Sequence, residues 1–461
     1  MASPPADVDL GKLSYEIFSL LESKFLFGGA AGVGSVPGTP ARAAAGEDRG
    51  RVRVLAIDGC GPGPGDALLA AVALARLEAA LRERAGDPDA RVADFFDAAA
   101  GAGAGGVLAA MLFLKGEDGR ARYTAADALA FVAASLGRRQ GGWGGEGARR
   151  SRWAALLFRR GERSPLRRVF GDATLRDTVA PLLVPCYDLA TAAPFLFSRA
   201  DAVESDSFDF RLRDVCAATC AGGAAAAAVR SVDGRTAIAA ASGGVAAMGN
   251  PAAAAITHVL HNKQEFPLAV GVDDLLVVSI GSGSSAAAVA ASATPSGGWR
   301  TPIPPRSPSP AEMVRLTAEG VADMVDQAVA MAFGHTCGRN YVRIQAASPA
   351  CSGKKALSSL DAKKAVAVAD GMLTQRNVEA ELFRGRRLSE KSNREKLDAF
   401  AAELVKEHER RARSPGLPNV VIKQVAATPR PSSATTASSA TATARTASTM
   451  PSPASQGSYG H

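Results

Sequence analysis

Two glycine-rich loops near the start of the chain have the composition of sites that hold a negatively charged oxygen. The first is DGCGPGPG at 58–65, and the second is GAGAGG at 101–106. A loop between a strand and a helix gathers backbone N–H groups at the positive end of the helix dipole, where they bind a phosphate or stabilise an oxyanion. The first loop lacks the lysine of a P-loop and the spacing of a dinucleotide fingerprint. A purely structural turn is the alternative for this loop taken alone.

Several side chains close to these loops or elsewhere could carry chemistry. Cys60 stands beside a predicted helix N-terminus, which favours a thiolate, but a packed thiol is the favoured interpretation over a nucleophile. Asp58 ends a predicted strand and is expected to cap loop amides rather than to act as a base. His258 and His261 are one helical turn apart, and polar surface contacts are favoured for them over a metal or base role. His335 stands alone and is interpreted as structural.

The apolar pattern predicts the elements that must position these loops. Alternating strands, glycine turns and helices are typical of an α/β fold with a largely parallel central sheet between helices. Helices are predicted over 66–84, with Asp66 as N-cap, and from 107 onwards. Strands are predicted at 51–58, in the segment before Gly101, at 182–189 and at 275–283.

The motifs in series resemble the patatin-like lipid acyl hydrolases. They are LAIDGCG, then DARVADFFDAAAGAGAGG, LLVPCYDLATAAPFLFS, SGGVAAMGNPAAAAITHVL and DDLLVVSIGSG, in this order. The resemblance runs from about 51 to 285 and is weaker up to about 385. The opening KLSYEIFSLLESKFLFG and the segment 381–393 are similar to the plant subgroup with a degenerate active site.

The resemblance assigns site positions one by one. The oxyanion loop of the family falls on Gly59, Cys60 and Gly61, but it is longer here and the family's arginine has no counterpart. The serine of the family's GxSxG turn falls on Gly103. The aspartate that activates this serine falls on Ser242. Neither a metal nor an organic cofactor is implied.

The resemblance implies a lipid acyl hydrolase that acts on phospholipids or galactolipids in lipid metabolism. The residues themselves favour a different class, because Gly103 has no side chain to attack an ester and Ser242 has no carboxylate to accept a proton. The alternative is therefore a catalytically inactive protein that binds lipid or serves as a scaffold at a membrane surface. A protein-interaction module on the same fold is a third possibility.

Composition divides the chain into four parts. These are an N-terminal amphipathic helix (12–27) and linker within 1–50, a patatin-like domain at 51–385, a charged helix and extension at 386–425, and a disordered Ala/Ser/Thr/Pro tail at 426–461. Ser392 and Glu395 have the spacing of a capping box that would start the charged helix, which either packs on the domain or projects from it.

Charge and cysteine usage bear on partners and location. The net charge is +8, and residues 138–168 hold ten arginines against two acids. This segment is interpreted as contacting anionic lipid head groups, with a solvated face as the alternative. Nucleic acid is not expected as a partner, since no nucleic-acid-binding motif is present.

Cys216 and Cys220 have no nearby histidine to complete a zinc site, and the six cysteines are interpreted as reduced thiols. With no signal peptide and no apolar run long enough to span a membrane, a cytoplasmic location is expected, with peripheral membrane contact as a variant.

Overall fold

A central eight-stranded sheet organises the protein. The computed structural model describes residues 50–59, 67–137, 164–221, 227–242, 249–281, 307, 310–346, 362–381, 385–413 and 420–422. The strands of the sheet run in the order β5-β6-β3-β2-β1-β7-β8, and β4 pairs with β3. Their bounds are β1 (Val52–Ile57), β2 (Ala98–Gly101), β3 (Leu182–Asp188), β4 (Ala193–Ser198), β5 (Ala227–Arg230), β6 (Ala237–Ser242), β7 (Leu275–Ile280) and β8 (Tyr341–Ile344).

Five of these strands, β3, β2, β1, β7 and β8, are parallel to one another. The remaining strands β4, β5 and β6 extend the sheet by antiparallel pairing. All residues of β1 and β7 are buried, which explains why these strands are largely apolar apart from Arg53 and Ser279 and do not alternate between apolar and polar residues. The predicted α/β fold with a largely parallel sheet is therefore confirmed.

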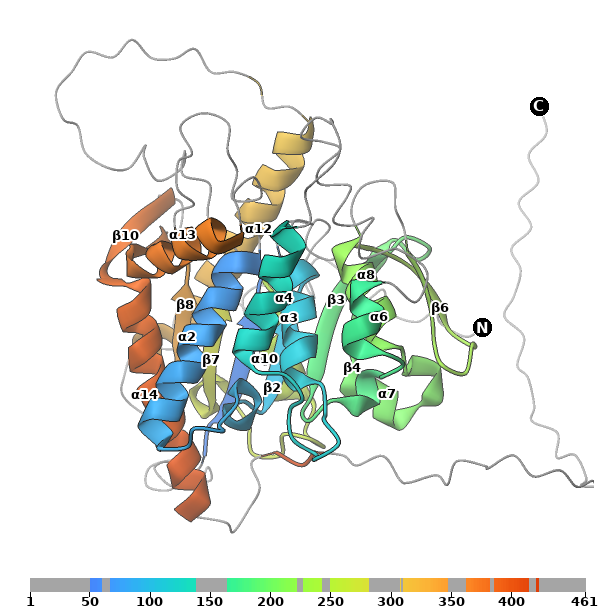
Figure 1. The fold of residues 1–461 in the computed structure, drawn as a ribbon, viewed down its shortest axis with the longest axis horizontal. Helices are drawn as coiled ribbons and strands as arrows, with labels where there is room; N and C mark the ends of the chain where they lie inside the picture. The colour runs from blue at the N-terminus through green and yellow to red at the C-terminus, as the bar shows by residue number, and fades with distance from the viewer. Residues whose placement is uncertain are drawn as a thin grey trace, which may run out of the picture.

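Helices cover both faces of the sheet (Figure 1). Leu55 and Ile57 of β1 point into one core cluster, which also contains side chains of several helices. Val52 and Val54 point the other way, into a second cluster with α10 and α12. The helices of the first cluster include α2 (Leu68–Ala85), α3 (Gly103–Phe113), α4 (Ala125–Gly137), α6 (Pro165–Phe170), α8 (Leu212–Cys220), α13 (Ala362–Thr374) and α14 (Asn393–Arg413). The helices of the second cluster are α10 (Ala252–His261) and α12 (Pro310–Phe333). A short helix, α7 (Arg199–Glu204), follows β4.

The C-terminal helix α14 packs on the domain beside α2 (Figure 1). Ser392 and Glu395 form the predicted capping box: the Ser392 N–H and hydroxyl donate to the Glu395 carboxylate, and the Glu395 N–H donates to the Ser392 hydroxyl. The apolar face of α14 is buried, with Leu397, Phe400, Ala401 and Leu404 among its members. A two-stranded hairpin of β9 (Arg376–Glu381) and β10 (Gly385–Ser392) leads into α14. The predicted boundary between 385 and 386 falls within β10, so this hairpin and α14 continue the folded unit.

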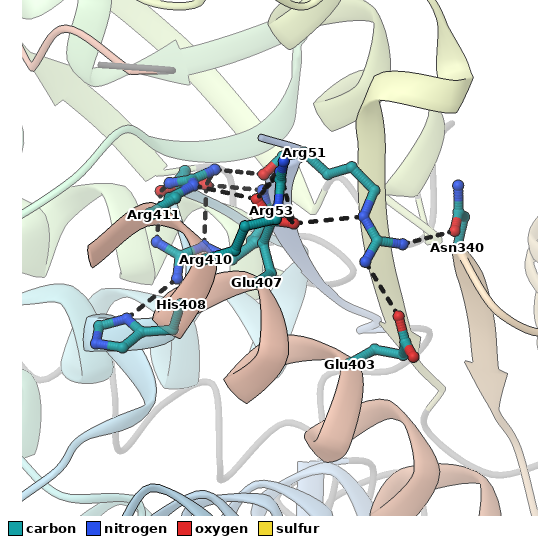
Figure 2. Close-up of polar contacts among 9 residues, drawn as sticks. Arg51, Arg53, Asn340, Glu403, Glu407, His408, Arg410 and Arg411 are labelled. Atoms are coloured by element: carbon teal, nitrogen blue, oxygen red, sulfur yellow. Dashed lines mark hydrogen bonds and ion pairs between the residues drawn. The ribbon is translucent and has the colours of Figure 1, made fainter. Parts of the chain in front are cut away.

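Ion pairs join the last turns of α14 to the residues at the start of β1 and to Asp97, just before β2 (Figure 2). Asp97 accepts hydrogen bonds from Arg53 (Nη2–Oδ1, 2.9 Å) and from Arg411 (Nη1–Oδ1, 2.7 Å). Arg51 donates to Glu403 across 3.0 Å. Burial alone would raise the pKa of Asp97, but the two guanidinium groups outweigh burial and lower the pKa to about 2. Helix α14 is thus held on the domain by these ion pairs in addition to the packing of its apolar face.

Two predicted helix starts were wrong. Helix α3 begins at Gly103, ahead of the predicted start at 107, because the glycines that resemble a loop form its first turn, with the Gly106 N–H donating to the Ala102 carbonyl. The N-cap of α2 is Ala67 rather than Asp66. The predicted N-terminal helix and the C-terminal tail lie outside the described residues, as does 138–163 of the arginine-rich segment.

Candidate active site

The turn between β2 and α3 forms the centre of the candidate site. Ala102 is extended, with φ −106° and ψ 146°, and Gly103 follows with φ +51° at the first position of α3. A positive φ of this kind favours glycine, since L side chains rarely adopt it. A strand that reverses into a helix through one such residue has the geometry of a nucleophile elbow. The structure therefore keeps the shape of the elbow, with glycine at its apex.

Close backbone contacts lock this elbow onto the end of β1. A Cβ on Gly59 would lie 1.8 Å from the Ala102 carbonyl oxygen, and one on Gly105 would lie 2.5 Å from the Asp58 oxygen. A Cβ on Gly101 would lie 2.4 Å from the Gly105 oxygen. No side chain fits at these three positions. The glycines that flank the apex are therefore required by packing, independently of any catalytic role.

A buried threonine holds the apex in place. The N–H of Gly103 donates to the Thr219 hydroxyl oxygen across 2.8 Å, and this hydroxyl donates to the carbonyl of Pro185 across 2.8 Å. Thr219 is fully buried in α8. One side chain thus ties the elbow to β3. The sequence analysis missed Thr219, because an isolated threonine in a helix carries no motif.

Ser242 lies at the end of β6, and its backbone pairs with Cys186 of β3. Cys186 directly follows Pro185, which accepts the hydrogen bond from Thr219. Strand β3 therefore connects the two positions that the resemblance pairs as nucleophile and base. The residues that follow Ser242 in the motif, 243–248, lie outside the described part of the chain.

The predicted oxyanion loop is described only up to Gly59. The Gly59 N–H donates to the carbonyl of Gly249 across 3.2 Å, so this amide already has a partner. Cys60 and Gly61 lie outside the described residues. The other N–H groups that can donate to an oxyanion belong to the first turn of α3. Helix geometry leaves the amides of Ala104 and Gly105 there without intrahelical carbonyl partners. The positive end of this helix is where an oxyanion can be stabilised.

Asp58 is held in a buried ion pair. Its carboxylate accepts hydrogen bonds from Arg343, at 3.0 Å from Nη1 and 2.5 Å from Nη2, and Arg343 also donates to Ser279 Oγ across 2.6 Å. Burial opposes the charge on Arg343, but the pairing with Asp58 raises the pKa of the guanidinium well above its ordinary value. Burial raises the pKa of Asp58 above its ordinary value, although Arg343 opposes this shift. Both carboxylate oxygens are engaged by the Arg343 guanidinium, and this pairing disfavours a role as base. The partner expected from the sequence, the amides of the loop, lies in the undescribed residues 60–66.

The histidines do not converge on one site. Nε2 of His258 lies 4.0 Å from Oε2 of Glu265, and Nδ1 of His261 lies 2.9 Å from the Thr257 carbonyl on the surface of α10. His335 is exposed in the turn after α12. Among the described residues, no group of three or more His, Cys, Asp or Glu side chains could hold a metal ion.

The described cysteines are free thiols. Cys186, Cys216 and Cys220 are buried and Cys337 is exposed. Burial raises the pKa of Cys220 to about 12 and that of Cys216 well above its ordinary value, so neither is a nucleophile at neutral pH.

Membrane insertion is a separate property. In the part of the chain that is described, no helix combines the length and apolarity needed to cross a bilayer.

Known proteins with similar sequences carry the same family name. Residues 55–256 match the family described as Patatin-like phospholipase, a span that includes Gly103 and Ser242. Patatin-like protein 3 of Oryza sativa subsp. japonica is 55% identical over 87% of this chain and 92% of its own length. Patatin-like protein 7 of Arabidopsis thaliana is 44% identical over 92% of this chain and 86% of its own length.

A further relative bears on activity. A protein of Arabidopsis thaliana named Probable inactive patatin-like protein 9 is 38% identical over 87% of this chain and 94% of its own length. The similarity to these relatives covers most of the chain, including the segments that form the elbow and the strands on either side of it. On this evidence, the chain belongs to the patatin-like protein family.

Proposed function

We propose that the protein is a slow lipid acyl hydrolase that acts on phospholipids and galactolipids. The observation that carries this proposal is the elbow itself: Gly103 stands at φ +51° at the head of α3, locked against Gly59, although it has no nucleophilic side chain. A turn with such a constrained backbone still positions an ester substrate when the residue at its apex is glycine rather than serine.

In the proposed reaction, water takes the place of the serine hydroxyl. Its oxygen forms a bond to the acyl carbon, the ester C–O bond breaks, and a proton of the water passes to the leaving alkoxide oxygen. The products are a free fatty acid and the deacylated lipid. The first-turn amides of α3 face the oxygen on which negative charge develops. A site that retains oxyanion donors and substrate binding but lacks the nucleophile accelerates hydrolysis by roughly 10³- to 10⁴-fold over water.

The second candidate is an inactive lipid-binding protein. It is favoured by the replacement of both dyad positions, Gly103 and Ser242, and by the ion pair that removes Asp58 as a substitute base. Loss of a member of a nucleophile–base unit costs on the order of 10⁴ to 10⁶ in rate. The name of the relative described as probably inactive is consistent with this candidate.

Contact with an anionic membrane surface is proposed for the arginine-rich segment 138–168. Its described end is α6, on which Leu166 and Phe170 are buried while Arg167 and Arg168 are exposed. These two guanidinium groups are therefore free to meet lipid head groups. Such attraction weakens as salt screens the charges.

The first experiment follows fatty acid release from radiolabelled phospholipid and galactolipid by the full-length protein. We expect slow release above a heat-denatured control, with no initial burst and no labelling by a fluorophosphonate probe, because no acyl-serine forms. Release that proceeds through an acyl thioester would contradict water attack and point to Cys60, to be tested with Cys60→Ala. Lipid binding with no release would favour the second candidate.

A second experiment tests the membrane contact by sedimentation with vesicles. We expect binding to vesicles that contain phosphatidylglycerol, and at least tenfold weaker binding when salt is raised from about 50 mM to about 500 mM. Arg167→Glu with Arg168→Glu should weaken this binding. The matched control is Arg413→Glu, since Arg413 is exposed at the far end of α14. Equal binding of both variants would contradict the proposed contact.

A further inference from the structure

The outward face of α12 carries an exposed apolar stripe. Its large members are Met313, Leu316, Met324 and Met331, with exposed fractions of 51%, 48%, 69% and 68%. They follow one another at steps of three, eight and seven residues, which keeps them on one side of a helix. The small residues Gly320 and Ala328 fill the positions between them. Scattered exposed apolar residues are ordinary, but a continuous stripe along a helix marks an interaction surface.

The acidic side chains of α12 do not interrupt this stripe. Glu319 and Asp323 pair with Arg386 of β10, and Asp326 accepts a hydrogen bond of 2.6 Å from the Tyr341 hydroxyl. Between Met313 and Met331 the one exposed polar side chain of the described stripe is that of Thr317, and its hydroxyl donates to the Met313 carbonyl of the same helix across 3.0 Å. Methionine side chains are flexible and polarizable, so a surface rich in methionine adapts to an apolar partner.

The chain itself contains a segment of matching pattern. Residues 12–27 have apolar side chains at helical spacing, at Leu13, Ile17, Leu20, Leu21 and Phe25. A helix of 16 residues is about 24 Å long, and the distance from Met313 to Met331 along α12 is about 27 Å. An amphipathic helix that lays its apolar face along such a stripe is a recurring mode of recognition.

The point where the chain enters the domain lies beside the segment that follows the C-terminal end of α12. Arg51 donates to Asn340 across 2.8 Å, and Asn340 stands shortly after the end of α12. Phe333, the last residue of α12, stacks on Tyr341 with 5.5 Å between ring centroids. Residues 28–49 join the two parts, and 22 residues can span up to roughly 70 Å when fully extended. The tether thus reaches the whole stripe.

We propose that residues 12–27 form an amphipathic helix that packs on the Met313–Met331 face of α12 in the same molecule. A tether of this length gives the segment an effective concentration in the millimolar range. At micromolar protein concentration this exceeds the concentration of a second copy by about a thousandfold. Intramolecular packing therefore prevails over association between molecules.

The experiment is photo-crosslinking of the full-length protein with p-benzoylphenylalanine in place of Met324. Trypsin cleaves after Lys12, Lys24, Arg315 and Arg339, so the proposed contact yields a link between peptides 13–24 and 316–339. The matched control places the same group at Leu189, which is 52% exposed in the turn after β3. We expect at least tenfold more linkage to 13–24 from position 324 than from 189.

Isotope mixing identifies the source of the linked segment. In a mixture of unlabelled and ¹⁵N-labelled protein, the proposal predicts links between peptides of the same isotope. Links between unlabelled and labelled peptides would overturn it in favour of a second copy on α12. Linkage to 13–24 no greater than that of the control at Leu189 would overturn it altogether.

Hydrogen exchange provides a second readout that does not depend on crosslinking chemistry. Met324→Glu should speed amide exchange in peptide 13–24 by at least tenfold, whereas Met324→Leu should leave it unchanged. Unchanged exchange in β1 and β7 shows that the domain is still folded. If peptide 13–24 exchanges equally fast in the parent protein and in Met324→Glu, the proposed contact does not exist.

Discussion

A Cβ atom on Gly103 would lie 2.9 Å from the carbonyl oxygen of Gly59 and 3.4 Å from its Cα. The elbow has therefore closed onto the end of β1 to a degree that suits glycine. A serine placed at position 103 needs a shift of the Gly59 backbone and a left-handed φ of +51° in a residue with a side chain. Installing a serine at position 103 is consequently more than a change of functional group.

The first prediction concerns the stability of Gly103→Ser and Gly103→Ala. Both variants should lower the free energy of unfolding by about 1–3 kcal/mol, since the strain arises from Cβ. Urea denaturation measures this loss. Gly86→Ala is the matched control, because Gly86 has φ +66° but open space around its Cβ position. Its loss should be smaller, and an equal loss would mean that contact with Gly59 contributes nothing.

The second prediction concerns Thr219, which bridges Gly103 and Pro185. Thr219→Val removes the hydroxyl and leaves a buried N–H and a buried carbonyl without their partner, so the free energy of unfolding should fall by about 1–3 kcal/mol. Thr219→Ser keeps the hydroxyl and should cost less. Urea denaturation of both variants decides the point. Because valine keeps the Cγ2 methyl, a Thr219→Val variant as stable as the parent protein would mean that the hydroxyl bridge contributes nothing.

The elements that local pattern can reveal were predicted from the sequence. Largely apolar runs identified β1 and β7, and the Ser392–Glu395 pair located the start of α14. The glycine motif also located the elbow at Gly103. Helix starts that depend on glycine were misplaced, because glycine at 103–106 reads as a loop until its packing partners are known.

The interactions that complete the site could not be predicted in this way. Thr219 meets Gly103 across 116 positions of sequence, and Arg343 meets Asp58 across 285. Neither partner belongs to a local motif. Only the order of the strands, which brings β8 beside β7 and β7 beside β1, places Arg343 within reach of Asp58. Long-range pairing of this kind is a property of the fold rather than of a segment.

The third prediction concerns the buried pair of Asp58 and Arg343. Arg343→Met leaves a buried carboxylate without its cation and should lower the free energy of unfolding by about 3–5 kcal/mol. Asp58→Asn combined with Arg343→Met removes both charges and should recover at least half of this loss. Chemical denaturation of the two single variants and the double variant gives the coupling. Strictly additive losses would show that the two charges do not stabilise each other.

The fourth prediction concerns the pH dependence of the contact between α14 and β1. The pKa of Asp97 is about 2 in the folded protein against an ordinary value of 3.8, so the unfolded state binds its proton first as pH falls. The stabilisation is therefore complete above about pH 5 and is lost as the pH approaches 2. Its size at neutral pH is about 2 kcal/mol. Urea denaturation at pH 7 and at pH 3 should show this loss for the parent protein.

Asp97→Asn should be less stable than the parent protein at pH 7, because Arg53 and Arg411 lose the charge that they share. The gap between variant and parent should narrow toward pH 3, since the parent carboxylate is then becoming protonated in the unfolded state. Glu409→Gln is the control, as Glu409 forms only an exposed pair with Arg413 and should change little at either pH. A gap for Asp97→Asn that stays constant with pH would mean that Asp97 stabilises the edge of the sheet through hydrogen-bond geometry and not through its charge.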